Sequence, residues 1–125
     1  MVLGESKMFI RGLKMNNKDN KQAIIDFLTN CDFKLRDIAK YAQEGHGFCG
    51  NDGYYALTYA NEREECEIIH EGAKPIPDGK VEVTYWTGES SDIIVDLDYY
   101  LETLAEYLSL KNEKELADKV REIID

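Results

Sequence analysis

The chain has 125 residues, a formal net charge of −10 at pH 7 and an apolar content of 43%, so it is long enough to form one domain with its own hydrophobic core. No apolar run approaches the roughly 18 residues that a membrane span needs, and the first twenty residues do not resemble a secretory signal, which together indicate a cytoplasmic protein. Three scattered cysteines, Cys31, Cys49 and Cys66, do not make a disulfide framework, so we expect reduced thiols.

The excess of negative over positive charge lies entirely in the second half of the chain. Residues 1–60 carry eight Lys or Arg and seven Asp or Glu, whereas residues 61–125 carry seven and eighteen. A field of this sign repels nucleic acid and membranes and attracts basic partners. The alternative is an acidic surface that serves only solubility.

The first half predicts two helices. Residues 1–18 are polar and basic, and we expect an edge strand or a flexible segment there, ahead of one domain over residues 19–125. The spacing Asp19-x-x-Gln22 is that of a capping box and predicts a helix from residue 19 to a stop at Asn30. Apolar residues at helical spacing predict a second helix over residues 33–43, joined to the first by a turn at Cys31-Asp32.

Residues 44–53, EGHGFCGNDG, contain four glycines and predict a loop with positive φ angles. The spacing Gly45-x-Gly47-x-x-Gly50 matches a dinucleotide-binding fingerprint, but that fingerprint follows a strand and opens a helix. Here the predicted order is the reverse, which excludes it.

The middle of the chain predicts strands over residues 54–59, 80–86 and 92–97, with a further strand beginning or ending at Ile68-Ile69. The last two strands alternate cleanly and predict an antiparallel hairpin. Trp86 lies on the face opposite Val81 and Val83, so it is exposed if helices cover only one face of the sheet and buried if both faces are covered.

Two helices are predicted to end the chain. The first carries an apolar stripe from Leu97 to Leu108, and Asn112-x-x-Glu115 has the spacing of a second capping box. This order of elements predicts an α+β fold, with a small antiparallel sheet, an N-terminal helical hairpin and two C-terminal helices.

His46, Cys49 and Asp52 are the candidates for chemistry. A Cys beside a His is typical of a nucleophile with its base or of two metal ligands, but no second ligand pair accompanies them. A packed loop, with Phe48 in the core and Cys49 buried as a small apolar group, explains the same residues. We therefore expect no catalytic residue, metal or cofactor, and keep as an alternative a small cytosolic enzyme or ligand-binding domain that uses this loop.

Acidic segments on either side of the predicted hairpin favour a binding surface instead. If they merge into one electronegative face, an exposed Trp86 within it is a candidate hot spot for a protein partner. The candidate partner-binding residues are Glu62, Glu64, Glu65, Glu67, Glu71, Glu82, Trp86, Glu89, Asp92 and Asp96.

The combination of a charged segment (REECEIIHEG), a hairpin (KVEVTYWTGESSDIIVDLD) and a following helix (YYLETLAEYL) resembles the immunity proteins of bacterial contact-dependent growth inhibition and related polymorphic toxin systems, over residues 19–110. The resemblance implies a protein that binds a cognate toxin domain, several of which are ribonucleases, and blocks its cationic cleft, without binding nucleic acid or membrane itself. An acidic adaptor for another basic protein fits the same pattern, and the oligomeric state is open.

Overall fold

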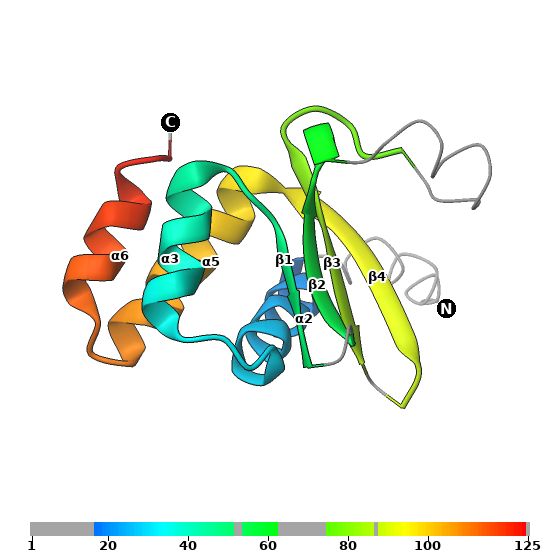
Figure 1. The fold of residues 1–125 in the computed structure, drawn as a ribbon, viewed down its shortest axis with the longest axis horizontal. Helices are drawn as coiled ribbons and strands as arrows, with labels where there is room; N and C mark the ends of the chain where they lie inside the picture. Colours follow the sequence, from blue (N-terminus) through cyan, green and yellow to red (C-terminus); the bar gives the residue numbers. More distant parts are fainter. Residues whose placement is uncertain (1–16, 52–53, 63–74, 87, 125) are drawn as a thin grey trace, which may run out of the picture.

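In the computed structural model, residues 17–51, 54–62, 75–86 and 88–124 are described. Four helices and a four-stranded antiparallel sheet form the α+β fold predicted from the sequence, with a pair of helices first and two helices last (Figure 1). The elements in chain order are α2 (Asn17–Asn30), α3 (Leu35–Glu44), β1 (Phe48–Gly50), β2 (Tyr55–Tyr59), the 3-10 helix η2 (Ala60–Glu62), β3 (Lys80–Trp86), β4 (Ser90–Asp96), α5 (Leu97–Leu110) and α6 (Lys114–Arg121). No helix within these ranges is long and apolar enough to cross a bilayer.

The strands lie in the order β1-β2-β3-β4, and each runs antiparallel to its neighbour. The predicted hairpin is confirmed, since β3 and β4 pair along their whole length, with Val81 opposite Val95 and Thr84 opposite Asp92. β4 begins at Ser90, earlier than predicted, and Leu97 belongs to α5 rather than to the strand. The predicted strand near Ile68-Ile69 lies outside the described residues, as do residues 1–16 of the predicted N-terminal segment.

The prediction of an uninterrupted loop over residues 44–53 is wrong, because residues 48–50 form β1 and pair with β2. Two glycines explain the difference, since they serve close packing rather than positive φ angles. A Cβ on Gly47 would lie 2.1 Å from the carbonyl oxygen of Leu57, and one on Gly50 would lie 2.1 Å from that of Cys31. Only a residue without a side chain lets the backbone approach so closely.

The observed ends of the helices agree with the predicted ones only in part. α3 is capped at its C-terminus by Gly45, which has a φ of 65° and whose N–H donates to the carbonyls of Tyr41 and Ala42. α2 begins two residues before Asp19, so the predicted start was late, while its end at Asn30 is confirmed. The second predicted capping box is wrong: Asn112 has a left-handed φ of 64°, and Glu113 precedes α6 without a side-chain cap.

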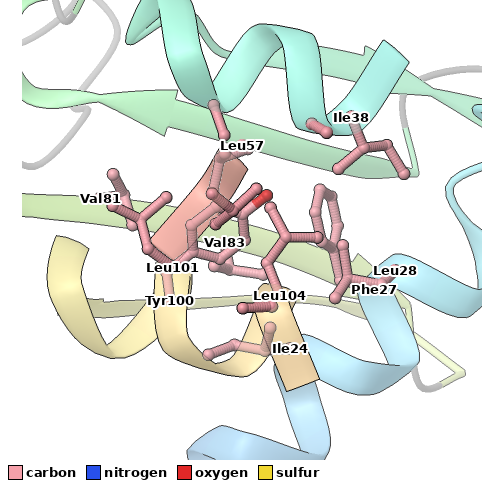
Figure 2. Close-up of a cluster of buried hydrophobic side chains, with 14 of the residues drawn as sticks. Ile24, Phe27, Leu28, Ile38, Leu57, Val81, Val83, Tyr100, Leu101 and Leu104 are labelled. Carbon is pink, nitrogen blue, oxygen red and sulfur yellow. The ribbon is translucent and has the colours of Figure 1, made fainter. Parts of the chain in front are cut away.

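All described helices lie on one side of the sheet (Figure 1). α2 and α5 contact the strands, and α6 packs on α3 and α5, farther from the sheet. Strand alternation sends Leu57, Val81 and Val83 toward α2 and α5, where they meet Phe27 and Leu104 in the core (Figure 2). Burying a side chain of this size stabilises the fold by about 1.5–3 kcal/mol.

Two tyrosines bring hydroxyl groups into this core. The hydroxyls of Tyr59 and Tyr100 are buried and form no hydrogen bond with any described residue. Burial, reinforced by the charge of Glu62, raises the pKa of Tyr59 to about 12, and burial raises the pKa of Tyr100 well above its usual range. Both hydroxyls are therefore held neutral at a cost to stability.

Candidate protein-binding face

The side of the sheet away from the helices is the candidate site, and we call it the outer face. Directly opposed residues share a face, so the register of the four strands decides which side chains belong to it. β1 contributes one residue, β2 two, and β3 and β4 four each. These residues are Cys49, Ala56, Thr58, Lys80, Glu82, Thr84, Trp86, Ser90, Asp92, Ile94 and Asp96.

Trp86 is exposed on this face and has one aromatic neighbour among the described residues. Its indole lies edge to face with Tyr54, which directly precedes β2, with ring centroids 4.9 Å apart and an interplanar angle of 60°. Trp86 keeps 43% of its surface exposed and Tyr54 keeps 49%. Of the two states predicted for Trp86, exposed or buried, the structure has the exposed one, because the described helices cover only the other side of the sheet.

Polar side chains pair across β3 and β4 on the same face. The Thr84 hydroxyl donates to Oδ1 of Asp92 over 2.8 Å, which orients that carboxylate. At the far end of the strands the Lys80 ammonium forms an ion pair with Asp96. The charge of Asp96 is thus balanced, whereas Asp92 and Glu89 form no ion pair with residues in the described ranges, so the end beside Trp86 is the anionic one.

The predicted acidic residues fall into three groups. Glu89, Asp92 and Asp96 are exposed on or beside the hairpin, and Glu82 lies half-buried on the outer face. Glu64, Glu65, Glu67 and Glu71 lie outside the described residues, so their predicted place on the same surface stays a prediction.

Glu62 forms the third group, because its carboxylate is used inside the fold. It accepts hydrogen bonds from the backbone N–H of Gly47 at 3.0 Å and of Tyr59 at 3.0 Å, and it pairs with Nδ1 of His46 at 2.9 Å. Its side chain is only 26% exposed. A carboxylate with three internal partners has little capacity left for a partner protein, so we place it outside the interface.

The glycine-rich segment does not bring its His and Cys together. His46 pairs with Glu62 and packs on the ring of Tyr41, with centroids 5.7 Å apart. Cys49 lies at the centre of β1 on the outer face and is exposed, so the expectation that it is buried is wrong. Phe48 does pack against the core, as expected, beside Phe27 and Phe33. Among the described residues no group of three or more His, Cys, Asp or Glu is placed to hold a metal ion.

A shallow groove of about 370 Å³ lies elsewhere, between α2 and α5 in the helical layer. Its lining includes Ile25, Tyr107 and Leu110, and Leu110 is 80% exposed. Lys21 and Glu106 form an ion pair of 2.7 Å on its edge, which raises the pKa of Lys21. Leu110 is thus an exposed apolar residue in the helical layer, away from the outer face. Its substitution can serve as a control for the substitution of Trp86.

Sequence reasoning did not single out Tyr54 as a site residue. Seven tyrosines lie between residues 54 and 107, and nothing in their spacing separates the one beside Trp86 from the rest. The contact depends on the pairing of β2 with β3, across a connection of twenty residues between Tyr59 and Lys80.

Comparisons with models of protein families, with curated protein sequences and with solved structures found no significant match for this chain.

Proposed function

We propose that this chain binds a basic protein partner through the outer face of its sheet, and that the partner is a nuclease toxin domain whose active site it covers. The observation that carries the proposal is the exposed Tyr54–Trp86 pair, which lies on the face of the sheet that none of the described helices covers. Beside it lie the exposed residues Glu89 and Asp92, which form no ion pair with another described residue. Large aromatic side chains in such positions contribute most of the affinity at many protein interfaces.

The charge of the chain supports a basic partner. A net charge of −10 on 125 residues attracts cationic surfaces and speeds their encounter with the chain at low salt. An enzyme that cleaves nucleic acid needs a cationic cleft to hold the phosphate backbone. An acidic face with an aromatic anchor is complementary to such a cleft, and covering the cleft prevents substrate from entering.

The resemblance to contact-dependent growth inhibition immunity proteins supplies the biological context of the proposal, with action in the bacterial cytoplasm. The proposed interface comprises Tyr54, Glu82, Trp86, Glu89, Asp92 and Asp96. The function requires no catalytic residue, metal or cofactor on this chain.

The test uses the C-terminal domain of the protein encoded immediately upstream of this chain's gene. We expect a one-to-one complex by native mass spectrometry at micromolar concentration, and loss of the domain's nuclease activity when one equivalent of the chain is added. No complex at micromolar concentration, or a complex that leaves nuclease activity unchanged, contradicts the proposal.

A further inference from the structure

We propose that the Trp86 end of the outer face is a binding site for an arginine side chain of the partner. This inference rests on the proposed function and narrows it from a basic surface to one type of side chain. The site consists of Trp86, Tyr54 and Asp92, with Glu89 at its edge.

The aromatic pair supplies accessible ring surface at this end of the face. Three large hydrophobic side chains are exposed in the described part of the chain, Tyr54, Trp86 and Leu110, and two of them lie against each other at this point. The residue opposite Trp86 on β4 is Ser90, which is too small to cover the indole. An indole face attracts cations through its quadrupole, and Trp is the strongest of the aromatic side chains in this respect.

Asp92 supplies the countercharge at a defined position. It lies on the outer face two residues from Ser90, and therefore one cross-strand pair away from Trp86. The hydrogen bond from Thr84 to Oδ1 fixes the carboxylate and leaves Oδ2 for another donor. Glu89, in the turn that follows Gly88, adds a second negative charge at the same end of the hairpin.

The opposite end of the face lacks this combination. The Lys80–Asp96 ion pair places a cation there and balances the carboxylate, and no exposed large aromatic residue of the described ranges lies beside it. A cationic ligand is therefore directed to the Trp86 end by both charge and aromatic surface.

A guanidinium group matches this site better than an ammonium group does. It is planar and weakly hydrated, so it stacks on an indole, and its fork of donors reaches a neighbouring carboxylate at the same time. A lysine ammonium is a strongly hydrated point charge that gains less from the aromatic surface. Arginine is also common where proteins bind phosphate groups. An inhibitor that binds such an arginine of the toxin therefore blocks part of the site that holds the toxin's substrate.

The test uses hexa-arginine, hexa-lysine and hexa-citrulline peptides at low ionic strength. Trp86 is the only tryptophan in the chain, so its fluorescence reports binding at this site directly. We expect hexa-arginine to change the Trp86 emission and to bind about threefold to fivefold more tightly than hexa-lysine, and neutral hexa-citrulline to leave the emission unchanged.

Two variants assign the effect to the site. Asp92→Asn is expected to weaken hexa-arginine binding about twofold to fivefold, measured by fluorescence. Glu102→Gln removes one exposed carboxylate from α5 in the helical layer and is expected to change the affinity less than Asp92→Asn does. Equal affinity for the arginine and lysine peptides, or equal effects of the two variants, overturns the arginine site.

The proposed function and the arginine site fail in different ways. If the toxin domain is bound and inhibited but the arginine and lysine peptides do not differ, the face binds basic proteins without an arginine site. If hexa-arginine binds at Trp86 as expected but the toxin domain forms no complex, the arginine site holds and the assignment of the partner is wrong.

Discussion

The carboxylate of Glu62 accepts a hydrogen bond from the backbone N–H of Gly47 at 3.0 Å, and this bond connects η2 to the segment that leads into β1. A Cβ at residue 47 would meet Oε1 of Glu62 at 2.5 Å and the carbonyl of Leu57 at 2.1 Å. The contact therefore depends on a glycine at this position. It belongs to the scaffold that holds β1 against β2, rather than to the outer face.

Gly47→Ala is expected to lower the free energy of unfolding by about 1–3 kcal/mol, because the added methyl group forces two backbone segments apart. Gly45→Ala is the control, since a Cβ there meets nothing within 4 Å and adds only the strain of a left-handed conformation. Urea denaturation followed by circular dichroism compares the two. A Gly47→Ala variant as stable as the parent contradicts the close packing described here.

Glu62→Ala is expected to destabilise the fold by about 2–4 kcal/mol, because two backbone N–H groups lose a charged acceptor. His46→Ala removes the third partner, whose side chain is 60% exposed, and is expected to cost less than about 1 kcal/mol. The comparison is made by denaturant unfolding at pH 7. Equal losses in the two variants would show that the His46 contact, and not the backbone bonds, gives Glu62 its role.

The sequence predicts well those helices and strands whose own apolar residues recur with the helical or strand period. The hairpin alternates over Val81 and Val83 with a period of two, and the stripe from Leu101 to Leu108 has the helical period, because in both cases one face is buried. The strand β1 was not predictable in this way. It has three residues, includes a glycine, and exists because Gly47 and Gly50 permit contacts with distant backbone.

The candidate site could be predicted only in part, for the same reason. Strand alternation separates Trp86 from the core, and the exposed state of Trp86 then follows from which side the helices cover. The proximity of Tyr54, and the use of Glu62 inside the fold, depend on contacts between segments far apart in the chain. Composition does not distinguish one acidic residue from another. In the structure the backbone N–H groups of Gly47 and Tyr59 donate to the Glu62 carboxylate, which leaves it little capacity to bind a partner.

Tyr100→Phe is expected to leave the free energy of unfolding unchanged or to raise it by about 1 kcal/mol. The hydroxyl is fully buried and makes no hydrogen bond with a described residue, so its removal relieves a desolvation cost while the ring keeps its packing. Thermal and urea unfolding measure the change. A loss of more than about 1 kcal/mol would reveal a hydrogen bond to this hydroxyl in solution.

Stability is expected to fall as the pH rises from 10 toward 12. The pKa of Tyr59 is about 12 in the folded chain and 10 for an ordinary tyrosine, so above pH 10 the unfolded chain loses a proton that the folded chain retains. Unfolding then releases protons, so a higher pH favours the unfolded chain. The contribution of Tyr59 to the free energy of unfolding, about 2–3 kcal/mol, is complete below pH 10 and is lost as the pH approaches 12. Urea unfolding at pH 9, 10 and 11 measures this slope.

Tyr59→Phe is expected to make that slope shallower, because the variant cannot ionise at this position. Tyr54→Phe, at a half-exposed tyrosine, serves as the control for removing a tyrosine hydroxyl outside the core. A Tyr59→Phe variant with the full slope would assign the alkaline instability to other groups.

The proposed docking of a toxin domain on the outer face, with Trp86 as its anchor, can be tested by isothermal titration calorimetry of that domain with two variants of the chain. Trp86→Ala is predicted to weaken binding at least about tenfold, as expected for a buried hot-spot aromatic. Leu110→Ser removes an equally conspicuous exposed apolar side chain from the helical layer and is predicted to change the affinity less than about twofold. Parent affinity for Trp86→Ala, or a larger loss for Leu110→Ser than for Trp86→Ala, would contradict docking on the outer face.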